Sequence, residues 1–228
     1  MVLVTGANQG IGLETARRLV EAGCLVYVGA RNAERGTAAA AEIGARFVLL
    51  EVTSDVSVAA AAAQIGAETG HLDILVNNAG ITGPQDDVHD LTGAGMEQVL
   101  ATNVVGYVRV IHAFLPLLER ASAPRIVNVT SGLGSQARFH DLSTIESRAG
   151  SPFYAASKAA INMLTVRYAR LLPGIRINAA DPGLTATAFT GGMGHSVTDG
   201  TDAIIRFAIG EDRDLTGHYR DRDGDVAW

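Results

Sequence analysis

The chain has 228 residues, of which 47% are hydrophobic and 18% charged, and its formal net charge is −6. This is the composition of an ordinary globular protein, and the acidic balance argues against a general binder of nucleic acids. The single cysteine, Cys24, excludes a disulfide framework. We find no run of the ~20 apolar residues that span a bilayer and no signal-peptide pattern. We therefore expect a soluble, cytoplasmic protein with neither membrane nor nucleic-acid partners.

Short apolar runs alternate along the chain with alanine-rich amphipathic stretches. The runs lack period-2 alternation, which is typical of strands buried on both faces. They are Val2–Thr5, Cys24–Ala30, Phe47–Val52, Leu72–Val76, Arg125–Thr130 and Ile175–Ala179. Helices are predicted over 10–22, 32–44, 55–69, 93–120, 151–172 and 198–210. The alternation predicts an α/β fold with a doubly wound parallel sheet of about seven strands, flanked by helices on both faces.

Two prolines and two polar segments interrupt this pattern. We expect Pro116 to kink or end the fourth helix and Pro173 to end the fifth. Residues 132–150 and 181–197 are polar and unpatterned, and each follows a predicted strand. Ligands of open α/β sheets bind beyond the carboxyl ends of the strands, so we expect both segments to border a site. Because no linker or repeat divides the chain, residues 1–228 are expected to form a single domain.

A glycine-rich turn follows the first predicted strand and opens the first helix. Residues 5–12 read TGANQGIG, with the spacing G-x-x-x-G-x-G. Glycines there permit a tight turn and close approach of a phosphate, and the helix N-terminus offers free N–H groups to it. A glycine-rich turn can also be only a turn, but between a strand and a helix it predicts nucleotide binding.

The end of the second predicted strand distinguishes between two dinucleotides. An enzyme that uses NAD usually has Asp or Glu there to bind the ribose 2′-hydroxyl. This chain instead has Arg31, whose guanidinium suits a 2′-phosphate. The alternative is a solvated arginine at a helix start. We favour NADP(H) over NAD(H).

The basic residues contain a further signal. Of 18 lysines and arginines, 17 are arginine, and the only lysine, Lys158, lies four residues after Tyr154. This spacing places both side chains on one helix face. An ammonium group nearby favours the phenolate form of tyrosine and lowers its pKa toward neutral pH, where proton transfer is efficient. Arginine is bulkier and planar, so it is not an equivalent partner.

Over essentially its whole length the chain resembles the short-chain dehydrogenase/reductase family, with its single-domain Rossmann fold. The motifs that carry the resemblance are TGANQGIG at 5–12, NNAG at 77–80, Asn103, Ser131, YAASK at 154–158 and DPGLTAT at 181–187. The resemblance implies that Tyr154 is the general acid/base and that Ser131 hydrogen-bonds the substrate carbonyl. It also implies that Lys158 holds the nicotinamide ribose and that Asn103 supports a water in the proton relay.

The cofactor site implied by the resemblance, together with Arg31, includes residues at the ends of five of the six predicted strands and two residues of the fifth predicted helix. It comprises Gly6, Asn8, Gln9, Gly10, Ile11, Gly12, Arg31, Asn32, Glu51, Val52, Asn78, Ala79, Gly80, Tyr154, Lys158, Pro182, Gly183 and Thr185. Glu51 stands where the family often has Asp beside the adenine. No metal site is expected, because the histidines show no metal-ligand spacing.

Segment 132–150 resembles the insertion of carbonyl-reductase-like members of the family. It is expected to form a wall of the substrate cleft, or to cover the helix face through which other members form tetramers. The oligomeric state therefore stays open between a monomer, a homodimer and a homotetramer. The substrate loop, 184–197, is short and glycine-rich.

The function expected from these features is NADPH-dependent reduction of an aldehyde or ketone to an alcohol, or the reverse. Two alternatives are a non-catalytic NADP(H)-binding sensor, which has no need of Tyr154 and Ser131, and a methyltransferase, whose chemistry does not need YAASK. Substrate identity depends on 132–150, Gly83–Asp90 and 184–197, whose conformations the sequence leaves open.

Overall fold

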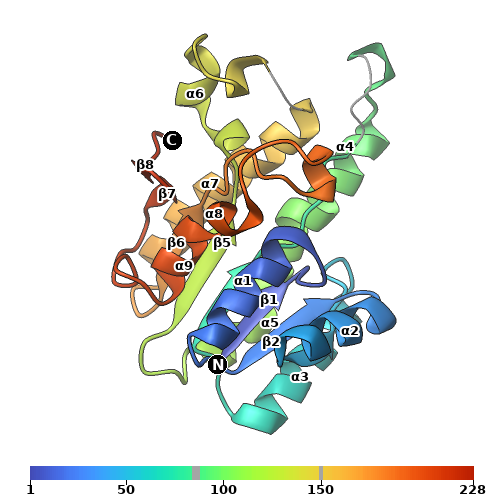
Figure 1. The fold of residues 1–228 in the computed structure, drawn as a ribbon, viewed down its shortest axis with the longest axis vertical. Coiled ribbons are helices and arrows are strands. Elements are labelled where there is room, and N and C mark those ends of the chain that lie inside the picture. Colours follow the sequence, from blue (N-terminus) through green and yellow to red (C-terminus); the bar gives the residue numbers. More distant parts are fainter. Residues whose placement is uncertain (84–87, 149–150) are drawn as a thin grey trace.

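The computed structural model describes residues 1–83, 88–148 and 151–228 (Figure 1). Its described strands form one eight-stranded sheet in the order β3-β2-β1-β4-β5-β6-β7-β8. All neighbouring pairs are parallel except β7 and β8. The strands are β1 (Val2–Thr5), β2 (Val26–Ala30), β3 (Arg46–Leu49), β4 (Ile74–Asn77), β5 (Arg125–Val129), β6 (Arg176–Ala180), β7 (Tyr219–Asp221) and β8 (Gly224–Asp225).

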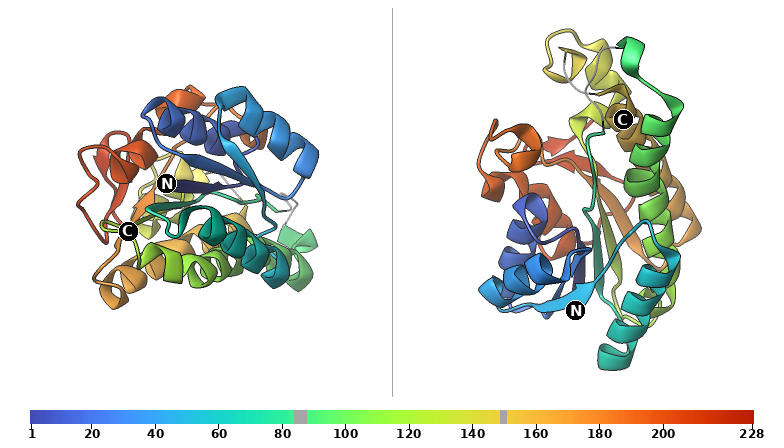
Figure 2. Two further views of the ribbon diagram at one scale, coloured as in Figure 1. Left: turned by 90° about the horizontal axis from the view of Figure 1, so that it is seen from below. Right: turned by 90° about the vertical axis from the view of Figure 1, so that its right-hand side faces the viewer.

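Helices cover both faces of the sheet (Figure 2). The larger ones are α1 (Gly10–Glu21), α2 (Ala33–Ile43), α3 (Asp55–Thr69), α4 (Gly93–Leu100), α5 (Gly106–Leu118), α7 (Pro152–Leu171) and α9 (Asp202–Ala208). The shorter ones are α6 (Gln136–His140), α8 (Val197–Gly200), the π-helix η2 (Ala101–Val105) and the 3-10 turns η1 (Val88–Asp90), η3 (Gly132–Gly134), η4 (Glu146–Arg148) and η5 (Ala188–Thr190). The doubly wound α/β prediction is confirmed.

Two buried clusters hold the layers together. On one face, side chains of α1, α2 and α9 pack against Val2 and Val4 of β1. On the other face, α3 and α5 pack against Leu3 of the same strand. Successive residues of a strand point to opposite faces, so a strand covered on both sides needs apolar residues without alternation. This explains why the central strands read as continuous apolar runs.

Local signals set the helix ends. The side chain of Asn32 accepts a hydrogen bond from the Arg35 amide at 2.9 Å and caps α2, and Ser54 caps α3 in the same way. Gly44 and Gly70 end these two helices in the left-handed conformation. Pro152 is the first residue of α7, where the missing N–H costs nothing.

The structure differs from the predicted helix 93–120 at two places. A π-helix at Ala101–Val105 interrupts it, and α5 continues past Pro116 to end at Leu118. Among the described residues, this run, Gly93–Leu118, is the one helix long and apolar enough to cross a membrane by length and composition alone, with a mean hydropathy of 1.4. The run includes Glu97, Asn103 and Arg109, so it is not an uninterrupted stretch of apolar residues of the kind that the sequence prediction excludes. Core helices of globular proteins meet the same criterion, and α5 buries Val110, Phe114 and Leu118 against the sheet.

The C-terminal strands were not located by the sequence pattern. β7 and β8 are short and carry charged residues, so they lack the apolar runs that mark the central strands. They extend the sheet beyond β6 and bring the last residues of the chain against segment 132–140. There the Ser135 hydroxyl donates a hydrogen bond to the Ala227 carbonyl at 2.6 Å.

Candidate active site

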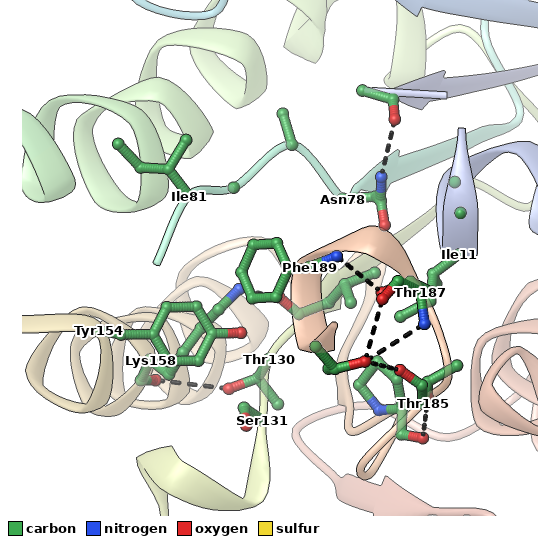
Figure 3. A pocket seen from close by; sticks show the side chains of 18 of the residues that line it. Ile11, Asn78, Ile81, Thr130, Ser131, Tyr154, Lys158, Thr185, Thr187 and Phe189 are labelled. Carbon is green, nitrogen blue, oxygen red and sulfur yellow. Dashed lines mark hydrogen bonds between the residues drawn. The ribbon is translucent and has the colours of Figure 1, made fainter. Parts of the chain in front are cut away.

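A cavity of about 420 Å³ lies across the carboxyl ends of β1 to β6. Residues that follow each of these six strands line it, together with residues of α1, α7 and the loops 131–146 and 181–190. We call residues 6, 8–12, 30–31, 50–52 and 78–81 its glycine-lined end. We call residues 129–133, 145–146, 154, 158, 181, 184 and 189 its tyrosine-lined end. In Figure 3, Ile11 and Asn78 lie on one side of the pocket and Tyr154, Lys158 and Ser131 on the other.

The backbone shapes the glycine-lined end. Gly6 has φ +65°, and a Cβ there would lie 2.9 Å from the Ala79 Cα atom. A Cβ on Gly12 would lie 2.5 Å from Asn78 Nδ2 and 2.7 Å from the Gly6 carbonyl oxygen. Both positions therefore require glycine because no space exists for a side chain. α1 begins at Gly10 without a hydrogen bond from a capping side chain, so its first amides remain available to an anion.

The NNAG motif fixes the glycine-rich turn to the neighbouring strand. The Thr5 hydroxyl accepts hydrogen bonds from the amides of Asn78 and Ala79 at 2.9 and 3.0 Å. Asn78 Nδ2 donates to the carbonyls of Thr5 and Gly6 at 2.9 and 3.3 Å. Asn78 thus lines the cleft and also holds the ends of β1 and β4 together.

Two arginines stand near the outer part of the glycine-lined end. The Arg31 side chain lines the cleft, is 76% exposed, and lies 4.0 Å from Glu51. Arg35, on the first turn of α2, donates a hydrogen bond to the Gln9 side chain. Glu51 also accepts hydrogen bonds from the amide and hydroxyl of Thr53. Arg35 is not among the predicted site residues, although its position four residues after Arg31 indicates a second cation near the same strand end.

At the tyrosine-lined end, Tyr154 and Lys158 lie on the same face of α7, as their spacing predicts. Lys158 is 2% exposed, and its Nζ donates a hydrogen bond to the Val129 carbonyl at 2.8 Å. The same Nζ lies 5.4 Å from the ring centre of Tyr154 and 5.6 Å from that of Tyr107. The ammonium group is thus enclosed by two aromatic rings and the end of β5.

Burial dominates the acidity of this pair. It raises the pKa of Tyr154 well above its usual value, and the negative charge of Asp181 adds to the rise. Burial lowers the pKa of Lys158 to about 8, which Asp181 partly opposes. The expected net lowering of the Tyr154 pKa toward neutral pH is therefore not observed, because burial, reinforced by the charge of Asp181, sets the direction of the shift. At neutral pH the phenol is protonated and most of the lysine is charged.

Ser131 and Asn103 occupy different places relative to the cleft. Ser131 lines it, its Oγ accepts a hydrogen bond from the Leu133 amide at 3.2 Å, and its hydroxyl interacts with the Tyr154 phenol, which opposes the rise of the Tyr154 pKa. Asn103 is fully buried in the π-helix and does not line the cleft. Its side chain binds both the amide and the carbonyl of Ile81 at 2.9 Å and donates to the Ser157 hydroxyl at 3.0 Å. It thereby joins the loop after β4 to α7.

A network of charged side chains, none predicted as a site residue, lies behind Ser131. The Arg138 guanidinium contacts the carboxylates of Glu146 and Asp181 at 3.0 Å and that of Asp221 at 2.5 Å. The Asp181 side chain is only 1% exposed, and burial raises its pKa although Arg138 opposes the rise. These four residues come from segment 132–148, the end of β6 and β7. No sequence spacing connects them, since only the fold brings them together.

The predicted substrate loop closes on itself at its base. The Ala186 amide donates to the His195 carbonyl at 2.9 Å, and the His195 amide donates to the Leu184 carbonyl at 3.0 Å. Phe189, on η5, places its ring 5.6 Å from that of Tyr154, as Figure 3 shows. The loop therefore brings an aromatic side chain to the tyrosine-lined end.

The structure brings nearly all the predicted site residues together. Every predicted residue lines the cleft except Asn32 and Asn103, whose side chains are used for a helix cap and for the loop after β4. Segment 132–150 contributes Leu133, Ile145 and Glu146 to the cleft wall, as expected. Residues 149–150 of that segment, and 84–87 of the predicted substrate region Gly83–Asp90, lie outside the described residues.

Comparisons with known proteins identify the class. The family model described as short chain dehydrogenase matches residues 1–197. Short-chain dehydrogenase anuI from Penicillium roqueforti is 37% identical over 236 residues, covering 97% of this chain and 93% of its own. (-)-Isopiperitenone reductase from Mentha piperita is 31% identical, covering 99% and 97%. The chain belongs to the short-chain dehydrogenase/reductase family.

Solved structures support the same assignment. The NADPH-bound carbonyl reductase from chicken fatty liver superposes with a TM-score of 0.87 at 29% identity, covering 100% of this chain and 98% of its own. Salutaridine reductase from Papaver somniferum gives a TM-score of 0.82 at 26% identity, covering 95% and 97%. The protein is an oxidoreductase with a fold that binds nicotinamide cofactors.

Proposed function

We propose that this enzyme uses NADPH to reduce an aldehyde or ketone to an alcohol, or NADP⁺ to catalyse the reverse, with Tyr154 as general acid/base. One observation carries the proposal. Tyr154, Lys158 and Ser131 line the same cleft as the glycine-rich turn and the open N-terminus of α1. A site that combines a dinucleotide cradle with a positioned proton donor fits carbonyl reduction.

The residues of the cleft fit a nicotinamide dinucleotide. The absence of space for any side chain at Gly6 and Gly12 allows the backbone to approach a pyrophosphate, and the first amides of α1 face it. Lys158 and the loop 182–185 would flank the nicotinamide end, and Glu51 with Val52 the adenine end. When bound, the reduced cofactor supplies the hydride that the carbonyl carbon accepts.

The chain's own groups handle the proton. The Ser131 hydroxyl, beside the Tyr154 phenol, donates a hydrogen bond to the substrate carbonyl and orients it. The Tyr154 phenol, which its raised pKa keeps protonated, delivers a proton to the same oxygen as negative charge develops there. The charged Lys158 nearby stabilises the phenolate that results. Asn103 acts as a positioning residue through Ile81 and Ser157.

A test of this function measures NADPH oxidation across a panel of aldehydes, ketones and quinones. We expect turnover of at least one class, and we expect Tyr154→Phe to lower kcat by about a thousandfold, within the usual range for loss of a general acid. The variant should bind NADPH with nearly unchanged affinity, because the hydroxyl group is the only part removed. A fully active Tyr154→Phe enzyme would contradict the mechanism.

The rival function is a cofactor sensor without turnover. Binding of NADPH without oxidation of any carbonyl compound in the panel would favour the sensor. The presence of Ser131 and Tyr154 side by side with Lys158 supports the enzyme, because a sensor has no use for a proton donor and a carbonyl ligand.

The preference for NADPH over NADH is supported by two cations at one end of the cleft. Arg31 lines the cleft and is mostly exposed, which leaves its guanidinium accessible to a 2′-phosphate, and Arg35 on the first turn of α2 adds positive charge beside it through its contact with Gln9. We expect Arg31→Ala to weaken NADPH binding by about tenfold and to leave NADH binding unchanged. Arg167→Ala, at an exposed position of α7, is the matched control. Equal losses for both cofactors would contradict this preference.

A further inference from the structure

The wall of the tyrosine-lined end has an apolar part that faces the space beside Tyr154. Phe189 lies against the Tyr154 ring, and Leu133, Ile145 and Leu184 also line the cleft. Ile145 and Leu184 are 58% and 41% exposed, so they present apolar surface to an incoming molecule. These side chains favour a substrate with an apolar or aromatic body.

Carboxylates stand beside this apolar wall. Glu146 and Asp181 both line the cleft, and the Oε1 atom of Glu146 packs against Gly132, the residue next to Ser131. Their cation, Arg138, also pairs with Asp221, so one positive charge faces three negative ones. Arg138 itself does not line the cleft. Arg138 and its three carboxylates therefore carry a net negative charge close to the position where Ser131 would hydrogen-bond a substrate carbonyl.

No cation at this end is free to neutralise a substrate anion. Among the lining residues in the described part of the chain, the basic ones are Arg31 and Lys158. Arg31 lies at the glycine-lined end beside Glu51. Lys158 is enclosed by the Val129 carbonyl and two tyrosine rings. A carboxylate entering the tyrosine-lined end would lose water without gaining a counter-ion.

We propose that Glu146, supported by Asp181, is a specificity-determining residue that restricts the enzyme to uncharged or cationic apolar carbonyl compounds and rejects substrates that carry a carboxylate. This inference rests on the proposed carbonyl reduction and names its substrate class. The carboxylate of Glu146 acts through charge at short range in a partly enclosed cleft, where electrostatic interactions are stronger than in water. The apolar wall favours an apolar substrate body, and Glu146 with Asp181 disfavours a substrate that carries a negative charge.

The test compares two aldehydes that differ in one charge, methyl 4-formylbenzoate and 4-formylbenzoate. With NADPH, the wild-type enzyme is expected to show a kcat/KM for the ester about tenfold or more above that for the acid. Glu146→Gln, which removes the charge and keeps the shape, is expected to reduce this ratio by about threefold or more. Glu21→Gln, at an exposed position at the end of α1, is the control and should leave the ratio unchanged.

Because the ratio is measured within one protein sample, partial unfolding of a variant lowers both values and leaves it intact. Equal kcat/KM for the two aldehydes in the wild-type enzyme would overturn the inference, and so would an unchanged ratio in Glu146→Gln. If neither aldehyde and no other carbonyl compound is reduced, the proposed function fails. Calorimetric titration of both compounds into the NADPH-loaded protein then decides the inference: weaker binding of the acid supports it, and equal or tighter binding overturns it.

Discussion

At the glycine-lined end of the cleft the chain offers backbone amides and glycines, whereas at the tyrosine-lined end it offers charged and aromatic side chains. The first end is assembled from strand ends and turns, with Gly6 and Gly12 pressed against residues 78–79. The second is assembled from α7, the ends of β5 and β6, and segment 132–148. At the glycine-lined end, added side-chain atoms at Gly6 or Gly12 would collide with the backbone. At the tyrosine-lined end, the site instead depends on which side chains are present.

The difference matches the two tasks of an oxidoreductase in this family. A nicotinamide dinucleotide is a constant ligand, so a rigid cradle of turns and a helix N-terminus serves it. Substrates vary, and side chains from segment 132–148 and the loop after β6 line the end where a substrate is proposed to bind. The predictions below therefore separate the two ends by which ligand each substitution affects.

After Tyr154→Phe, the largest effect is expected at the single lysine. Lys158→Arg keeps the charge but places a bulkier planar group where Nζ now fits between the Val129 carbonyl and two tyrosine rings. We expect kcat to fall by about a hundredfold. Steady-state kinetics with saturating NADPH measures it, and Arg167→Lys is the control for the reverse exchange at an exposed position of α7. Normal activity of Lys158→Arg would show that this position does not require lysine, and that the excess of arginine reflects only a coding preference.

The glycine-lined end is tested by adding one methyl group. Gly12→Ala places a Cβ 2.5 Å from Asn78 Nδ2 and 2.7 Å from the Gly6 carbonyl, so the turn must shift. We expect the Kd for NADPH to rise by about tenfold, with a smaller change in the KM for substrate. Fluorescence titration of NADPH measures the first value. Gly174→Ala, where a Cβ meets no atom within 4 Å, is the matched control. An unchanged Kd would show that this end is less tightly built than its geometry indicates.

The tyrosine-lined end is tested by removing one cation. Arg138→Met leaves the buried Asp181 carboxylate without its counter-ion and releases Glu146 and Asp221. We expect the free energy of unfolding to fall by about 2 kcal/mol at pH 7 and the substrate KM to rise about fivefold, with the NADPH Kd unchanged. Urea unfolding and steady-state kinetics measure these.

Two further variants examine the reason for that loss. Arg138→Lys keeps the charge and should recover part of the stability. Adding Asp181→Asn to Arg138→Met removes the unpaired carboxylate and should also recover part of it. A loss that neither variant recovers would show that Arg138 acts by packing and not by charge.

The smallest effect is a pH dependence of stability. Because the pKa of Lys158 is lowered to about 8 by burial, the folded protein binds fewer protons than the unfolded chain between pH 8 and the ordinary lysine value. Stability relative to Lys158→Met should therefore rise by roughly 1 kcal/mol between pH 8 and pH 9. Urea unfolding of both proteins at pH 8 and pH 9 measures the difference. No other lysine titrates in this window. A constant difference would contradict the lowered pKa.

Features carried by local pattern were predictable from the sequence. Each of the six apolar runs overlaps a strand of the sheet, and their ends differ by a few residues. The runs are recognisable because burial on both faces requires apolar side chains. The glycine-rich turn was predictable because close backbone contact at Gly6 and Gly12 excludes every other residue. Tyr154 and Lys158 meet because helix geometry places residues four apart on one face.

Features that depend on contacts between distant segments were not. β7 and β8 pair through backbone groups and carry no apolar run, so their composition does not mark them as strands. The π-helix that holds Asn103 interrupts a sequence that reads as one continuous helix. Arg138 is one of 17 arginines until the fold places it among three carboxylates, at separations of 8, 43 and 83 residues.

The sequence by itself determined the doubly wound sheet, the dinucleotide turn and the pairing of tyrosine with the only lysine, since each follows from periodicity or from a residue type that has no substitute. The tertiary structure alone decided the acidity of that pair. Loss of solvent raises the pKa of Tyr154 and lowers that of Lys158, and the buried Asp181 adds to the rise of the first and opposes the fall of the second. Burial and the positions of distant charges are properties of the packed chain, so no local spacing reveals them.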